Sequence, residues 1–386
     1  MIKTEEKQRV IDLICMPWLE MSGDEFIGDV HFIPVKKFLD SCDDPQIEKR
    51  VKEVFGCYVD EIHEPVKTGV ICQLAGKPEL PKLSDSEISQ VRRAVDALCF
   101  AAIYQLACSE IGYNNYQHYC STALFELIQH RSTPQQEHFS HTKRRVTIIN
   151  CSYDHKFHRP EGLLNTRPCF NDEIIDALSK LQSPDNIKLQ ERVFRSLEWV
   201  RFAHSDSEEV SEGAKIVMMG TAFEILLHIT DRRNKKRQLM NRLDKLCRSF
   251  VSAMEFRKLD EEKVEFSRIA WWMHDFYNLR NDIVHGGQLD DAKFCVEQPD
   301  DKFEYGVNHL QVATVVIGEC IWRLLCEKKI VGNKCRAYSR FFMRFKDSLT
   351  FHDMVKRNAL IYTGSERVHK MLGWMKAHDD YDEEDE

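Results

Sequence analysis

The hydrophobic pattern of the chain changes at residues 181–187, and this change constrains the fold more than any other feature. Before it, short β-branched runs bounded by Gly and Pro accompany one long helical pattern; after it, apolar residues recur only at helical spacing. The change coincides with "LQSPDNI", whose Pro, Asp and Asn are typical of a loop. The sequence therefore predicts an α+β region followed by an all-α bundle, mainly α overall.

The region before the change mixes strands with a helix. Strands are expected at Glu25–Val35, Val66–Gly76 and Arg144–Tyr153, and a helix at Ser84–Gly112, which opens on Ser and Asp. We expect this region, residues 1–182, to sense a trigger or to restrain the activity of the rest of the chain.

The region after the change is expected to be helical throughout. Short polar connections between its helices favour antiparallel neighbours and hence a bundle over residues 187–335, followed by a helical extension and acidic tail at 336–386. The expected helices are Lys188–His204, Ser211–Ile229, Lys235–Phe250, Glu262–Val284 and Gly306–Lys328.

Composition excludes several classes of protein. With 43% hydrophobic and 30% charged residues, the 386-residue chain is globular, and its net charge of −8 argues against coating nucleic acid through an overall positive field. The 14 cysteines contain no CxxC pair, and the N-terminus is charged. We therefore expect reduced thiols, a cytoplasmic location and no membrane span, since no apolar run approaches about 20 residues.

The stretch "YNLRNDIVHGG" places Arg280, Asn281 and His285 at the end of the fourth expected helix. Gly286 is the expected residue just past the helix end. A histidine can act as a general acid or base near neutral pH, an arginine binds phosphate oxygens with two parallel donors, and an asparagine can orient either group. This set suits RNA cleavage by the ribose 2′-hydroxyl, without a metal or other cofactor.

One helix does not direct Arg280 and His285 to the same point. Five residues separate them by roughly 140° around the axis and about 7.5 Å along it. Two copies of the helix related by a two-fold axis could surround one cleft with two arginines and two histidines. The spacing therefore indicates half of a site in a homodimer.

The same residues carry a family resemblance. "LRNDIVHG" resembles the R-x4–6-H motif of the HEPN superfamily, and "GTAFEILL" resembles the helix that places an acidic residue, here Glu224, in the bundle of many members. The chain is most similar to the ApeA-like HEPN proteins of bacterial anti-phage defence. The resemblance covers residues 187–329 and implies a bundle, a homodimer formed through it, and a metal-independent endoribonuclease with Arg280, Asn281, His285 and Glu224 in its site.

Two further segments fit the bare motif. Arg131–His138 contains Pro134, which argues against a continuous helix, and Arg268–His274 lies in mid-helix without an adjacent Asn or a terminating Gly. The helix-end context therefore favours Arg280–His285. The alternatives are a solvated helix end whose Arg and His complement the helix dipole, and a non-catalytic HEPN scaffold for dimerisation or nucleic-acid binding.

The basic run Asp231–Arg248, which leads into the third expected helix, is the candidate RNA-binding surface in this acidic chain, with a solvated charged face as the alternative. Its first members are Arg232, Arg233, Lys235, Lys236 and Arg237.

Histidine pairs provide the alternative of a metal-dependent enzyme. His138 and His141, and likewise His155 and His158, lie three residues apart, with Cys151 nearby. A metal site would require a strand or loop geometry that the sequence does not establish, so no metal is expected.

Overall fold

The structure is a computed structural model in which the chain divides into two compact units. The first comprises residues 1–103 and 117–218, and the second comprises residues 104–116 and 219–386, so the border falls within helix α7 (Glu212–Leu226). The domain boundary expected at 182–187 stays a prediction. The structure describes residues 9–60, 62–109, 121–133, 136–143, 146–160, 163, 167–182, 186–207, 209–231, 233–247, 254–259, 262–287, 291–297 and 307–332.

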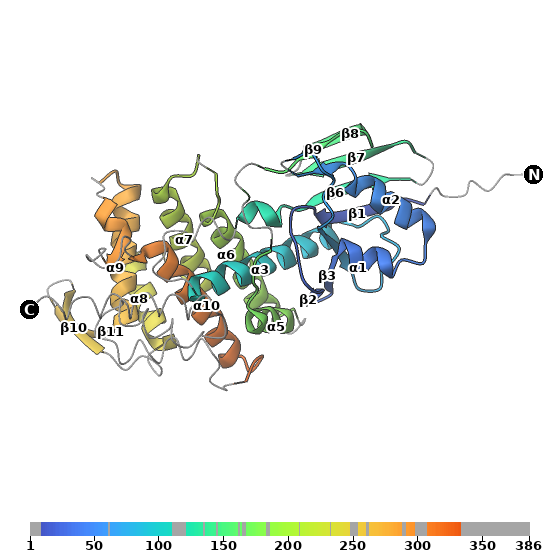
Figure 1. The fold of residues 1–386 in the computed structure, drawn as a ribbon. Helices are drawn as coiled ribbons and strands as arrows, with labels where there is room; N and C mark the ends of the chain where they lie inside the picture. Colours follow the sequence, from blue (N-terminus) through green and yellow to red (C-terminus); the bar gives the residue numbers. More distant parts are fainter. Residues whose placement is uncertain are drawn as a thin grey trace, which may run out of the picture. The chain divides into compact units, whose positions relative to one another are not determined.

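The first unit is built around an antiparallel sheet, as Figure 1 shows, and the α+β expectation for this region is confirmed. Its strands lie in the order β2-β3-β5-β1-β6-β7-β8, and each neighbouring pair is antiparallel. Along the chain the strands are β1 (Ile11–Met16), β2 (Glu25–Ile27), β3 (Val30–Pro34), β5 (Val70–Leu74), β6 (Ile128–Ser132), β7 (His138–Lys143) and β8 (Val146–Ser152). A short parallel pair joins β4 (Tyr58–Val59) to β9 (Phe157–His158).

Strand β1 lies inside the sheet and every one of its residues is buried. Because both faces are covered, its sequence "IDLICM" is a short apolar run without the alternation that identifies a half-buried strand. The sequence analysis therefore missed this strand.

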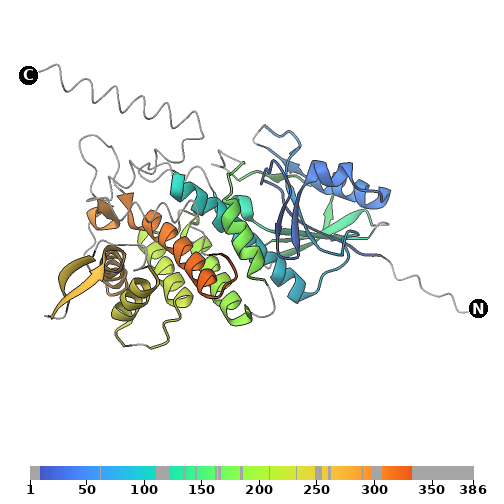
Figure 2. The same ribbon diagram turned by 90° about the horizontal axis from the view of Figure 1, so that it is seen from below.

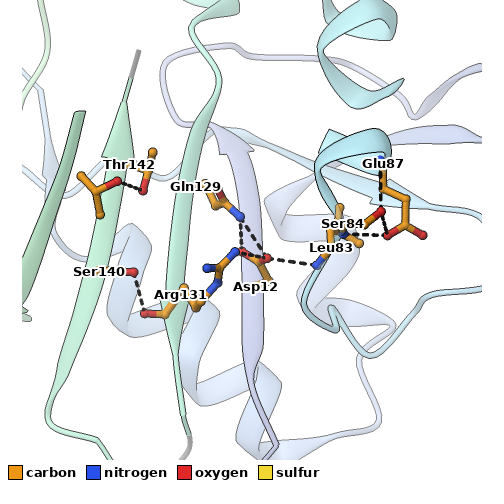
Figure 3. A network of polar contacts seen from close by, with 9 residues as sticks. Asp12, Leu83, Ser84, Glu87, Gln129, Arg131, Ser140 and Thr142 are labelled. Carbon is orange, nitrogen blue, oxygen red and sulfur yellow. Dashed lines mark hydrogen bonds and ion pairs between the residues drawn. The ribbon is translucent and has the colours of Figure 1, made fainter. Parts of the chain in front are cut away.

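Helices complete the first unit. They are α1 (Val35–Asp40), α2 (Pro45–Phe55), α5 (Asp172–Lys180), α6 (Ile187–Ala203) and most of α3 (Asp85–Ser109). Helix α3 begins with a capping box, drawn in Figure 3: the Ser84 backbone N–H donates to the Glu87 carboxylate (2.8 Å), and the Glu87 N–H donates to the Ser84 hydroxyl (3.4 Å). Its buried residues Val91, Val95, Leu98 and Ala102 follow helical spacing.

The second unit contains the end of α7 together with α8 (Lys235–Cys247), α9 (Arg268–Val284) and α10 (His309–Glu327), which Figure 2 shows from below. Helix α8 packs against both α9 and α10. The ring of Tyr104 lies on α10 at Gly318, where an added Cβ would come within 2.2 Å of that ring. A side chain at this position is therefore incompatible with the packing.

The expectation of an all-α bundle after residue 187 is wrong, because this part of the chain is also mixed α+β. Strands β10 (Met254–Leu259) and β11 (Glu262–Ser267) form a hairpin, and β12 (Cys295–Glu297) pairs with β13 (Val307–Asn308). The segment "EKVEFS" was assigned to the fourth helix, which begins only at Arg268. Its exposed Lys263 and Glu265 alternate with the more buried Val264 and Phe266, which is the period of a strand.

Helix α10 is the one helix of the described residues that is long and apolar enough to span a membrane. However, 89% of that apolar window is buried inside the structure. Such burial is typical of a helix in a protein core.

Candidate active site

Helix α9 ends where the sequence predicts. His285 is the C-cap residue directly after Val284, Gly286 has φ +71°, and the Gly287 N–H donates to the Asp282 carbonyl oxygen at 2.8 Å. The Gly286 N–H donates to the Ile283 carbonyl oxygen at 3.4 Å, which completes the hydrogen-bond pattern of a Schellman motif. Gly286 suits the left-handed backbone of this motif because it lacks a Cβ. The motif fixes the position of His285 at the helix end.

Arg280 points into the second unit. Its Cγ would lie 3.2 Å from a Cβ added at Gly220, so the glycine gives the arginine stem room beside α7. Its guanidinium lies over the Tyr277 ring, 5.3 Å from the ring centroid, and its side chain is only 20% exposed. The buried Arg280 Nε has no hydrogen-bond partner among the residues that the structure describes.

Glu224 of α7 receives donors from two other helices. The Tyr277 hydroxyl donates to its Oε1 at 2.8 Å, the Lys235 ammonium donates to its Oε2, and Arg280 Nη2 lies 3.7 Å from Oε1. The carboxylate is 14% exposed. Burial, followed by the hydrogen bond to the Glu224 carboxylate, raises the pKa of Tyr277 and keeps its hydroxyl protonated as a donor. We define Glu224, Lys235, Tyr277 and Arg280 as the Glu224 network.

Asn281 contacts the arginine directly. The Arg280 Nη1 group donates to the Asn281 Oδ1 at 3.2 Å. The side chain of Arg280 is therefore held by Glu224 on α7 and by Asn281 on its own helix. This arrangement orients the guanidinium, which is the group that would bind a phosphate.

His285 is not part of these contacts. Its side chain is exposed, and no described residue forms a hydrogen bond or an ion pair with it. One copy of the chain thus brings together Arg280, Asn281 and Glu224 and leaves His285 at the open helix end. This placement is compatible with the half site predicted from the angular spacing.

The basic run is largely engaged by the protein itself. Arg232 lies outside the described residues, and Arg233 is exposed. Lys235 pairs with Glu224, and Arg237 lies 3.9 Å from Glu262. These two side chains are less available to a phosphate backbone than their position in a basic run predicts.

Lys236 of α8 belongs to a second polar cluster, formed with residues of α9, that was not predicted from the sequence. Its ammonium donates to the Asn278 Oδ1 at 3.0 Å and lies 3.3 Å from His274 Nε2, while His274 Nδ1 lies 2.9 Å from Asp275 Oδ1. The spacing of His274 and Asn278, four residues apart on a helix, is the signal that could have identified this cluster. Helical spacing also indicates Tyr277, since it lies three residues before Arg280 and its ring contacts that guanidinium.

The histidines of the first unit form an aromatic cluster. His141 is buried and stacks on Phe157 at 4.3 Å between ring centroids, and the buried His130 ring lies 2.7 Å from the Tyr58 hydroxyl oxygen. Burial lowers the pKa of His141 to about 4 and that of His130 well below its usual value. Within the described part of the chain, no three His, Cys, Asp or Glu side chains are grouped so that they could hold a metal ion.

A second buried carboxylate lies in the sheet. Asp12 of β1 accepts hydrogen bonds from the Gln129 amide at 2.7 and 2.9 Å, from Arg131 at 3.1 Å and from the Leu83 backbone N–H at 3.2 Å. Figure 3 shows how these donors converge on it from β6 and from the segment before α3. We define Asp12, Leu83, Gln129 and Arg131 as the Asp12 network. Arg131, part of one of the two further motif matches, therefore lies on a strand and has a structural contact.

Comparison with known proteins gives no match: no family model, no curated protein and no solved structure aligns significantly with the chain. Function is therefore inferred from the residues of α9 and from the geometry around them.

Proposed function

We propose that the protein is a metal-independent endoribonuclease of the HEPN type, acting as a homodimer. The observation that carries the proposal is the arrangement at the end of α9. Glu224 and Asn281 orient Arg280 there. His285 lies exposed about one and a half turns further along the helix. The cationic groups around Glu224 outnumber its single carboxylate, because Lys235 and Arg280 both contact it. A net positive site suits a phosphodiester substrate.

The proposed reaction needs a base, an acid and a stabiliser of negative charge. His285 of one copy takes the proton of the ribose 2′-hydroxyl, and the 2′-oxygen bonds to the adjacent phosphorus. The bond from phosphorus to the 5′-oxygen breaks, and His285 of the second copy protonates that oxygen. Arg280 stabilises the additional negative charge on the phosphorane-like transition state. The products are a 2′,3′-cyclic phosphate and a free 5′-hydroxyl.

The biological setting proposed is a toxin-like effector of anti-phage defence in the cytoplasm. It follows from the resemblance of "LRNDIVHG" to the ApeA-like HEPN proteins. The described cysteines form no disulfide, which is consistent with a reducing compartment. The first unit is then the part that responds to a trigger and restrains the cleaving unit.

A cleavage assay with paired variants tests this proposal. End-labelled RNA is incubated with the full chain in the presence of EDTA, and the product ends are mapped. His285→Asn should lower the cleavage rate at least about a hundredfold, which is the lower range of general acid–base catalysis. Arg280→Ala should lower it to a similar extent through lost charge stabilisation.

Matched variants control for contamination and for surface effects. His228→Asn removes another exposed histidine at a helix end, and Arg195→Ala removes an exposed helical arginine. Both should cut RNA like the wild type. Equal activity of all four variants would place the site elsewhere.

A non-catalytic RNA-binding scaffold is the second candidate. The basic run favours it, since Arg233 is exposed and Lys235 remains 31% exposed although it pairs with Glu224. Saturable RNA binding without cleavage by the wild-type chain, at any EDTA or metal concentration tested, would support the scaffold over the enzyme.

A further inference from the structure

The two edges of the large sheet differ in how they are protected. Edge strand β2 has only three residues, includes Glu25, and is bonded to the α5 region. The Gly28 N–H just after it donates to the Ser179 hydroxyl at 2.8 Å, and the Gln182 amide donates to the Ile27 carbonyl oxygen at 3.2 Å. A short, charged and covered edge is the usual protection against pairing with another chain.

Edge strand β8 has none of these protections in the described part of the chain. It is seven residues long, and β7 is the only described strand that pairs with it. Its first five residues, "VTIIN", contain no charge and no proline and are all exposed. The backbone N–H and C=O groups on its outer side can therefore pair with an added strand.

The exposed side chains of β8 are large and apolar. Val146, Ile148 and Ile149 are 65%, 51% and 72% exposed. Alternation along a strand directs Val146 and Ile148 to one face and Ile149 to the other, so an added strand would cover apolar surface on both faces. The regular part ends at Asn150, which has φ +61° where the β7–β8 register shifts.

We propose that β8 pairs with β8 of a second copy in antiparallel orientation, which joins the two sheets into one. The charges beside β8 favour a second copy as the partner and favour the antiparallel orientation. Arg144 and Arg145 precede β8 in the sequence and Asp154 follows it, while Lys143 at the end of β7 already pairs with Glu126. Antiparallel pairing places the basic start of each strand near the acidic end of the other, whereas parallel pairing would place like charges together.

Two-fold symmetry also limits the register. The axis is perpendicular to the sheet, so residues directly opposite each other must point to the same face. Pairing centred on Ile148 satisfies this condition, since Ile148 then faces its own copy across the axis and Thr147 faces Ile149 of the other copy. The apolar side chains of both copies then lie together on one continuous sheet.

This surface is independent of the proposed active site, because it lies in the first unit and the α9 motif lies in the second. A chain with two self-complementary surfaces can assemble beyond a dimer. A result that disproves the β8 pairing would not bear on the proposed ribonuclease activity, and a result that disproves the activity would not bear on the pairing.

Sedimentation velocity over a range of concentrations tests the pairing. Ile148→Lys places like charges opposite each other across the two-fold axis, and it should reduce the mass of the largest species by half relative to the wild type. Ile62→Lys is the matched control, because Ile62 is 76% exposed but lies outside the sheet. It should sediment like the wild type, and circular dichroism should show that both variants are folded.

Hydrogen exchange provides a second readout. Peptides covering residues 146–150 should become more protected as the wild-type concentration rises, and Ile148→Lys should lose this dependence. Identical masses for the wild type and Ile148→Lys, with exchange that is independent of concentration, would overturn the proposal. Protection that is equal at all concentrations would indicate that a segment of the same chain covers the edge.

Discussion

The Asp12 network and the Glu224 network are both built on a largely buried carboxylate, but they differ in charge and in completeness. Asp12 is fully buried, and its donors are an amide, a backbone N–H and one guanidinium. Glu224 contacts two cations and one hydroxyl, and its cations Lys235 and Arg280 remain 31% and 20% exposed. The first network is neutral and ties strands to the start of α3. The second retains a positive charge that reaches solvent.

The difference separates a structural role from a functional one. Buried polar groups that are fully paired specify a fold, whereas a partly exposed cation held in a fixed geometry is suited to an anionic ligand. Substitutions in each network test whether the Asp12 network is structural and the Glu224 network is functional.

The largest effect on stability is expected for Asp12→Ala. It leaves Arg131 and the half-buried Gln129 amide without their buried acceptor, and we expect the free energy of unfolding to fall by about 3 kcal/mol. Urea unfolding followed by circular dichroism measures this loss. Asp176→Ala, which removes an exposed partner of Lys180, is the control and should change stability by less than about 0.5 kcal/mol. A loss as small as the control's would mean that the Asp12 network is not structural.

The next effect concerns the pH dependence of the first unit. The folded-state pKa of His141 is lowered to about 4, below its usual 6.5, chiefly by burial. The unfolded chain therefore binds more protons between these values, so His141 lowers the free energy of unfolding as pH falls from about 6.5 to about 4, by up to about 3 kcal/mol. His141→Gln should flatten this part of the stability profile. If the free energy of unfolding of the variant fell as steeply between pH 6.5 and pH 4 as that of the wild type, His141 would not be the group responsible.

A smaller effect, on rate rather than stability, is expected for Glu224→Gln. The amide keeps the shape of the side chain but removes the charge that orients Arg280, so RNA cleavage should slow roughly tenfold, which corresponds to about 1.4 kcal/mol. Initial rates on a labelled RNA measure the change. Glu212→Gln makes the same substitution earlier on α7, where the exposed Glu212 pairs with the buried Lys215, and should leave the rate unaltered. If Glu224→Gln instead lowered the free energy of unfolding by as much as Asp12→Ala, the two networks would be equivalent.

The smallest effect is expected for Tyr277→Phe, which removes only the hydroxyl donor to Glu224. The expected cost is about 1 kcal/mol of unfolding free energy. Because both side chains act within one network, the combined Tyr277→Phe and Glu224→Gln variant should lose less stability than the sum of the single variants. Additive losses in this double-mutant cycle would show that the 2.8 Å contact is energetically silent.

Local signals in the sequence were sufficient for the helix end and for most helices. The end of α9 depends on Gly286 and Gly287 and on hydrogen bonds within one turn, so residues close in sequence decide it. The start of α9 depends on the β10–β11 hairpin, and the preceding segment alternates over too few residues to outweigh the helical pattern that follows. Contacts between α7, α8 and α9, such as Lys235 with Glu224, depend on packing that no local pattern encodes.

The proposal that Arg280 and His285 act together across two copies is tested most directly by mixing inactive variants. Arg280→Ala chains and His285→Asn chains are combined, dissociated and reassociated, and RNA cleavage is measured in EDTA. A mixed dimer retains one Arg280 and one His285 on different chains, and it therefore keeps one of the two guanidiniums and one of the two imidazoles of the site. The mixture should cut RNA faster than either variant alone, although more slowly than the wild type, which has both imidazoles. A mixture that remains as inactive as its components would contradict the composite site.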